Sequence, residues 1–96
     1  MLTVDSRPLN PALANQSIAI PNHASRKILT PSFQPDGTLL FYFSWTKQQI
    51  APTSQVDITI VKATGLSTAP DGASYAGLTR DAAGVAHHIF WIINPQ

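Results

Sequence analysis

Three histidines are the residues best suited to chemistry in this chain, and two of them are adjacent. His87 and His88 would be a candidate metal site if both imidazoles could reach one ion. The residues around them predict a strand, however, and neighbouring side chains on a strand point to opposite faces. His23 is the only other histidine, and the sequence has neither glutamate nor cysteine to complete a ligand set. We therefore expect no metal site, with one of the paired histidines facing the core or an interface and the other facing solvent.

Catalytic groups are equally sparse. A nucleophile needs a neighbouring base and a third group that orients the base. The serines lie in no G-x-S-x-G context, and the sequence has neither a glycine-rich phosphate loop nor a pair of carboxylates. Asp57 is isolated on the polar face of a predicted strand, and Lys62 lies too far along that strand to pair with it. The sequence thus predicts a protein that is not an enzyme and needs no cofactor; turnover abolished by His87→Ala or Asp57→Ala would overturn this expectation.

Charge and hydropathy exclude two classes of partner. The formal net charge is +1, and the basic residues are scattered, with Arg26-Lys27 as the one adjacent pair. Proteins that bind nucleic acid instead gather basic side chains on one face, so we expect no nucleic-acid partner. No apolar run approaches the roughly 20 residues that span a bilayer, so we expect no membrane partner. Asp5, Arg7 and Pro8 stand where a secretion signal would need an apolar segment, which predicts synthesis and folding in the cytoplasm.

The composition also predicts an all-β chain whose surface is partly covered. Charged residues make up 11% of the sequence, less than half of the ~25% usual in soluble domains. All five acids are aspartates, and glutamate, which favours exposed helix faces, is absent. Eight prolines further oppose helix. Because so few charges solvate the surface, we expect another chain to cover part of it.

The most regular pattern lies in residues 38–46, directly after an Asp36-Gly37 turn signal. Aromatic and aliphatic residues alternate there with a period of two, which predicts a half-buried strand. Its apolar face carries Leu39, Phe41, Phe43 and Trp45. A second strand is predicted over residues 55–63, ended by Thr64-Gly65, with Val56, Ile58 and Ile60 on one face.

Two further strands complete the predicted body. Residues 74–79 form a short strand weakened by Gly77, between a turn at Pro70-Asp71-Gly72 and another over residues 80–84. The last strand covers residues 85–93 and is ended by Asn94-Pro95. Both of its faces are apolar: Val85, Ile89, Trp91 and Ile93 lie on one, and Ala86, Phe90 and Ile92 on the other. Such a strand is either central in a sandwich or buried against another chain.

Residues 1–35 are interrupted by five of the eight prolines, which divide them into short apolar pieces. Short edge strands are predicted at residues 17–20 and 26–30. A disordered tail is the alternative, but disordered tails are usually charged and poor in apolar residues. We expect an ordered, extended arm that crosses a neighbouring subunit, since 35 extended residues reach on the order of 100 Å. The expected anchors of this arm are Leu2, Val4, Ile18, Ile20, Ile28 and Leu29.

Residues 36–96 would then form a small β-sandwich or barrel of about 60 residues. A body of that size without disulfides or metal gains only a few kcal/mol from one core, so a homo-oligomer, dimer or trimer, is expected to supply further burial. The residues expected to form the core or the oligomer contact are Phe41, Phe43, Trp45, Phe90, Trp91 and Ile92. An aromatic platform for sugars, built from Tyr42, Trp45, Tyr75 and Trp91, is a weaker alternative because the tryptophans lie on apolar strand faces.

This profile of a proline-broken, low-charge arm over Pro8 to Pro35 and a β body over Thr38 to Ile93 resembles the small decoration, or cement, proteins of tailed bacteriophage capsids. Members of that group are often β-rich dimers or trimers whose extended termini clamp capsid subunits. The resemblance implies a non-enzymatic protein, located in the virion and made in the host cytoplasm. Its implied partner is the major capsid protein or another virion protein, bound where subunits meet.

Two alternatives come from other classes. The segment 75–84 looks like the turn region of immunoglobulin-like binding or adhesion modules, which would predict a monomer that binds its ligand through loops. A different virion part, such as a tail, neck or fibre subunit, would share the structural chemistry and differ in partner.

Overall fold

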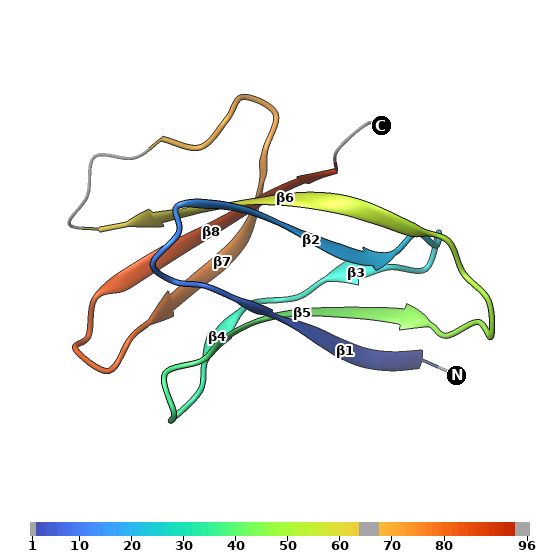
Figure 1. Cartoon of the computed structure of the whole chain (residues 1–96), viewed down its shortest axis with the longest axis horizontal. Helices are drawn as coiled ribbons and strands as arrows, with labels where there is room; N and C mark the ends of the chain where they lie inside the picture. Colours follow the sequence, from blue (N-terminus) through green and yellow to red (C-terminus); the bar gives the residue numbers. More distant parts are fainter. Residues whose placement is uncertain (1, 64–67, 94–96) are drawn as a thin grey trace.

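Eight antiparallel strands form two sheets in the computed structural model, which describes residues 2–63 and 68–93 (Figure 1). Sheet A contains β1 (Leu2–Leu9), β5 (Leu39–Thr46) and β3 (Lys27–Ile28) in that order, and β4 (Ser32–Phe33) also pairs with β5. Sheet B has the order β2 (Asn15–Pro21), β6 (Thr53–Lys62), β8 (Ala86–Ile93) and β7 (Ser74–Arg80). The predicted all-β class is confirmed. The described residues include no helix long and apolar enough to cross a membrane.

The core lies between the sheets and is built around β5, as its alternation predicts. Leu39, Phe41 and Phe43 are completely buried and Trp45 is nearly so. They pack against the inward face of β6, which carries Val56, Ile58 and Ile60. Burial of one such side chain stabilises the fold by about 1.5–3 kcal/mol, so the alternation of these two strands supplies much of the core.

Strand β8 is central in sheet B and is apolar on both faces. Ile89 is fully buried on the inward face, where Trp91 and Ile93 also pack against the core. Phe90 and Ile92 alternate with these residues and lie on the outer face, half-buried and covered by no other sheet. The position of β8 in the middle of sheet B therefore explains why its inward face is apolar, but it does not explain why its outer face is apolar.

The predicted turns are confirmed where the structure describes them. The backbone N–H of Ala73 donates to the carbonyl of Pro70 over 3.2 Å. Gly72 has a φ of +85°, which glycine adopts at low cost in this turn. The strand ends predicted at Thr64-Gly65 and Asn94-Pro95 lie outside the described residues.

Residues 2–35 form β1 to β4 within the two sheets, with turns between the strands. β1 pairs with β5 along its whole length, from Leu2 opposite Thr46 to Leu9 opposite Leu39, and β2 pairs with β6. The sequence pattern missed β1 because Pro8 interrupts it, although an edge strand tolerates proline on its open side. Reach of this segment onto a partner chain stays a prediction.

The predicted anchors of the arm have different environments here. Leu2 and Val4 are exposed, at 67% and 62%. Ile20 is completely buried, while Ile18 and Ile28 pack against the core. Leu29 is half-buried. In this conformation only the first two side chains are freely available to a partner.

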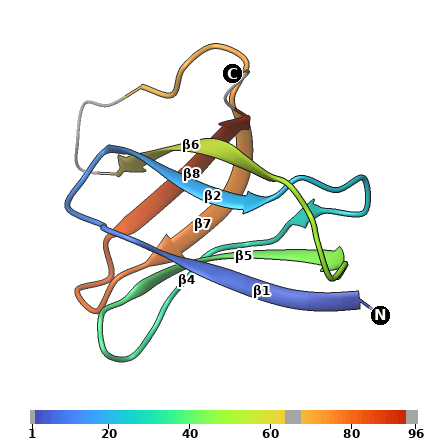
Figure 2. The same ribbon diagram turned by 45° about the vertical axis from the view of Figure 1, so that its right-hand side comes forward.

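Arg7 closes one open side of the sandwich, where β1 and β2 are the edge strands (Figure 2). Its Nε donates to the carbonyl of Ala19 in β2 over 3.1 Å, and its Nη1 donates to the carbonyl of Ser6 in β1 over 2.8 Å. The guanidinium also lies 5.2 Å from the ring centre of Phe43. One side chain thus connects the edges of both sheets.

The same contacts cap the middle of β1. The N–H of Ser6 donates to Oδ1 of Asp5 over 3.1 Å, and Nη1 of Arg7 donates to the Ser6 carbonyl. Pro8 has no N–H to offer. Charges and proline are devices that keep edge strands from pairing with other chains, so the centre of β1 is protected against strand addition.

The opposite side is closed by β4 and β7. The N–H of Phe33 donates to Oγ1 of Thr79 over 3.1 Å. Gly77 lies so close to Thr30 that an added Cβ would be 2.8 Å from the Thr30 Cγ2 atom. The strand-weakening glycine of the sequence is therefore required by a close approach between the two sheets.

Candidate functional site

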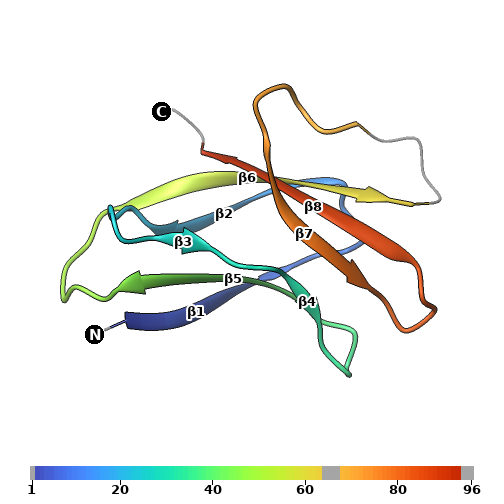
Figure 3. The same cartoon turned by 180° about the vertical axis from the view of Figure 1, so that it is seen from behind.

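A pocket of about 710 Å³ is lined by residues of the β1–β2, β4–β5 and β7–β8 connections and of the end of β6. These connections lie at the same end of the sandwich (Figures 1 and 3). Its lining comprises Pro11, Ala12, Phe33, Gln34, Pro35, Gly37, Lys62, Arg80, Asp81, Ala82, Ala83 and His87. Loops held by a rigid β scaffold are common places for binding sites. We therefore treat this end pocket as the candidate site.

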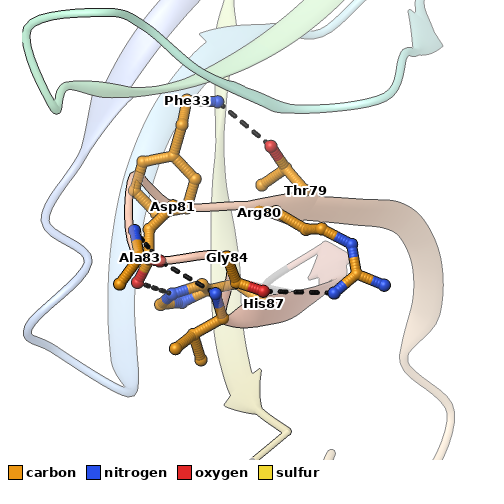
Figure 4. Close-up of polar contacts among 8 residues, drawn as sticks. Phe33, Thr79, Arg80, Asp81, Ala83, Gly84 and His87 are labelled. Atoms are coloured by element: carbon orange, nitrogen blue, oxygen red, sulfur yellow. Dashed lines mark hydrogen bonds and ion pairs between the residues drawn. The ribbon is translucent and has the colours of Figure 1, made fainter.

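Asp81 organises the β7–β8 turn at the pocket wall (Figure 4). Its Oδ1 accepts the backbone N–H groups of Ala83 and Val85 over 3.0 and 2.9 Å. Its Oδ2 lies 3.1 Å from Nε2 of His87. The hydrogen bond from His87 is the largest of the causes that hold the pKa of Asp81 below its ordinary value, followed by that from Val85. The hydrogen bonds of the carboxylate are consequently made within its own turn and to the adjoining strand β8.

His87 forms the inner end of this arrangement. The residue is 2% exposed, and its ring and that of Phe33 form a T-shaped pair with 4.9 Å between centroids. Donation to Asp81 requires the proton on Nε2, which leaves Nδ1 as a buried atom with no hydrogen-bond partner in the described part of the chain. His87 is therefore oriented by both the carboxylate and the aromatic ring.

The two adjacent histidines lie on opposite faces of β8, as the strand reading predicts. His88 is half-buried on the outer face, where its Nδ1 is 2.9 Å from the hydroxyl of Tyr75. Among the residues that the structure describes, no group of three potential metal ligands comes together. The histidine pair does not converge on one site.

The pocket is equipped for binding. Its walls are mainly apolar, and no serine, threonine, tyrosine or cysteine is among the described residues that line it. An Asp–His pair without a hydroxyl or thiol lacks the nucleophile of a catalytic triad. Lys62 and Arg80 add positive charge, and the Arg80 Nη1 donates to the carbonyl of Gly84 over 3.1 Å. The arrangement can hold a ligand by apolar contact and charge.

A second surface of interest is the outer face of sheet B. It carries six side chains that are apolar or aromatic: Val61, Tyr75, Leu78, His88, Phe90 and Ile92. Tyr75 is 53% exposed and Leu78 39% exposed. The Tyr75 ring packs 5.1 Å from that of Phe90, between centroids. We refer to these six residues as the outer patch.

The other residues singled out by the sequence are spread over the fold. Trp45 is buried and Trp91 packs against the core, so neither tryptophan joins a sugar-binding platform in this structure. Tyr42 is half-buried and bonds to Gln34. Asp57 lies opposite Ser17 in the pairing of β2 with β6, and its Oδ1 accepts a hydrogen bond from the Ser17 hydroxyl over 2.6 Å.

Sequence reasoning did not identify Asp81, Phe33 or Arg7 as important. Asp81 has a local signal, because an aspartate that opens a short turn often bonds to backbone N–H groups two residues on. Phe33 and Arg7 have no such signal, since their contacts come from strands distant in sequence. Comparison with protein families, curated proteins and solved structures found no match to this chain.

Proposed function

We propose that this chain is a non-enzymatic structural protein that decorates a viral shell and binds where major capsid protein subunits meet. The observation that carries the proposal is the outer patch, because strand β8, which is central in sheet B, presents an apolar second face that no other sheet covers. A contiguous apolar surface of this kind marks an interaction site. The aromatic side chains in it are of the type that dominates binding energy in protein interfaces.

The proposal includes a homo-oligomer, dimer or trimer, made in the host cytoplasm and located in the virion. Several copies in one assembly would strengthen attachment to a repeating shell, since each added contact is intramolecular once the first has formed. Leu2 and Val4 are exposed on the outer face of sheet A and are available for a second contact. The capped centre of β1 favours contact through these side chains over strand addition.

The test uses purified shells of the virus that encodes the chain, without their decoration proteins. Truncation of residues 1–35 is unsuitable because it removes four strands of the fold. The test variant is therefore Tyr75→Ser with Leu78→Ser, and the matched control is Ile50→Ser, which changes an apolar side chain that is 90% exposed outside the outer patch. Binding is measured by co-sedimentation, and solution mass by light scattering.

Wild-type protein and the Ile50→Ser control are expected to sediment with shells and to saturate at a fixed number of copies per capsomer. The double variant should bind at least tenfold more weakly, since hot-spot side chains each contribute more than about 1 kcal/mol. Failure of the wild-type protein to sediment at tens of micromolar would refute the shell-binding function. Equal binding by the double variant would refute the assignment of the outer patch.

A loop-based binding module is the second candidate, and the end pocket favours it. The strand order of this chain differs from that of the constant-type immunoglobulin sandwich. In that sandwich the first two strands are neighbours in one sheet, whereas here β1 and β2 belong to different sheets. The candidate is thus a ligand-binding sandwich of another topology. A stable monomer that fails to bind shells would favour it. Failure to bind shells together with binding to a tail, neck or fibre component would instead favour a role as another virion structural subunit.

A further inference from the structure

The end pocket has the size and walls of a site for a small organic group. Its volume of about 710 Å³ lies within the range of roughly 300–1,000 Å³ that is usual for ligand pockets. Apolar walls are supplied by three different connections: Pro11 and Ala12 from β1–β2, Phe33 and Pro35 beside the β4–β5 turn, and Ala82 and Ala83 from β7–β8. Such walls favour an aromatic or branched aliphatic body over a small, strongly hydrated ion.

The charged groups at this pocket leave an excess of positive charge. Lys62 is exposed, and neither it nor Arg80 makes an ion pair within the described residues. The one carboxylate, Asp81, already accepts two backbone N–H groups and faces His87. Of the two cations, Lys62 is on the same face of sheet B as His87, whereas Arg80 pairs with Ala86 on the outer face. A ligand therefore meets the unpaired ammonium of Lys62 and a carboxylate, that of Asp81, whose hydrogen bonds are already made.

The far end of the pocket is fixed in place. His87 is held between Asp81 and the ring of Phe33, and it is almost completely buried. Phe33 is in turn attached to β7 through Thr79. A site whose walls are already ordered loses little freedom when a ligand binds.

From this combination we infer that the end pocket binds a molecule in which an aromatic or branched apolar group carries a carboxylate. The apolar group lies against Phe33 and the proline and alanine walls, and the carboxylate faces Lys62. Two sources share this chemistry: a free aromatic acid, and the carboxyl-terminal residue of a protein chain. The inference deepens the second candidate function and does not depend on shell binding.

The test is a titration of the whole ¹⁵N-labelled chain followed by amide NMR shifts, with 3-phenylpropionate as the free acid. Its neutral amide tests the role of the carboxylate, and inorganic phosphate tests the role of charge alone. A tripeptide, acetyl-Gly-Gly-Phe, is compared with its carboxyl-terminal amide to represent a chain end. The informative amides are those of Gly37, Ala82 and Ala83, which line the pocket.

Three variants accompany the titration. Lys62→Gln removes one cation, and Lys47→Gln is its matched control, since this exposed lysine follows β5 at the end away from the pocket. Ala82→Trp places a large side chain on the exposed turn at the pocket and should obstruct it. Arg80 supports the turn through Gly84 and is on the outer face of sheet B, so Arg80→Lys should retain binding.

The acid is expected to bind with a Kd on the order of 0.1–1 mM, as a ligand of this size allows, and to shift the pocket amides. The amide should bind at least fivefold more weakly. Lys62→Gln should weaken binding of the acid by a similar factor without affecting the amide, and Lys47→Gln should have no effect. Preference for the tripeptide acid over 3-phenylpropionate would assign the site to a chain end.

Equal affinity for acid and amide would overturn the carboxylate assignment while leaving a neutral apolar ligand site, as the second candidate function requires. Shifts confined to residues away from the pocket, or no shift at 5 mM of any probe, would overturn both the ligand class and the site. Shifts caused by phosphate as strongly as by the acid would overturn the requirement for an apolar body. None of these results bears on sedimentation with shells.

Discussion

Replacing Arg7 tests whether one guanidinium holds the open side of the sandwich together. Arg7→Ala removes the hydrogen bonds to the carbonyls of Ser6 and Ala19, the contact with the Phe43 ring and the ion pair with Asp5 at 3.7 Å. Arg7→Lys keeps the charge, but an ammonium on a flexible stem does not reproduce the planar fork that reaches both edges. The two variants therefore separate charge from geometry.

The expected loss is moderate because the site is partly exposed. A net hydrogen bond contributes about 0.5–1.5 kcal/mol, and an exposed cation–π contact about 0.5–1 kcal/mol. The Arg7 and Asp5 side chains are 35% and 43% exposed, so their ion pair adds at most about 1 kcal/mol. With allowance for solvent, Arg7→Ala should cost about 2 kcal/mol and Arg7→Lys about half of that.

Thermal unfolding followed by circular dichroism measures this cost. For a chain of this length 1 kcal/mol corresponds to a change in Tm of roughly 4–8 °C, so Arg7→Ala should lower the Tm by about 10 °C. Its uncapped β1 edge should also increase self-association, detectable by light scattering. Lys47→Ala, at an exposed loop position, is the control for removal of a positive charge. A Tm for Arg7→Ala within 2 °C of this control, or an undiminished Tm for Arg7→Lys, would refute the clamp.

Gly77→Ala should lower the free energy of unfolding, measured in urea, by about 2–3 kcal/mol, because φ is +143° and the new Cβ would collide with Thr30. Gly37→Ala should lower it by less, because Gly37 has a φ of +90° but open space around it. Equal losses in the two variants would contradict the close approach of Gly77 to Thr30. Asp81→Asn should reduce the dependence of Tm on acidity. The folded-state pKa of Asp81 is lowered, so its carboxylate stabilises the fold above about pH 4, its unfolded value, and this contribution is lost as the pH falls through the folded pKa. The Tm difference between pH 6 and pH 2.5 should therefore be smaller in Asp81→Asn than in wild type or an Asp71→Asn control, and an unchanged difference would argue against the Asp81 contacts.

Several local features of this protein are determined by the sequence alone. The period-two spacing of Phe41 and Phe43 predicts β5, and that of Ile58 and Ile60 predicts β6, because successive side chains on a strand point to opposite faces. The opposite directions of His87 and His88 follow from the same rule. An all-β class follows from these patterns together with the absence of glutamate and the many prolines.

The pairing of the strands and the formation of the end pocket depend on the tertiary structure. The periodicity of a sequence predicts which face of a strand is buried, but it does not predict which other strand pairs with it. The segment over residues 2–35 therefore reads as an arm, whereas in the folded chain β1 completes sheet A and β2 completes sheet B. The contact of Arg7 with Ala19 and that of Phe33 with His87 exist only once both sheets have formed. The candidate site belongs to this second group, since its walls come from connections that are distant in sequence and are brought together by long-range strand pairing.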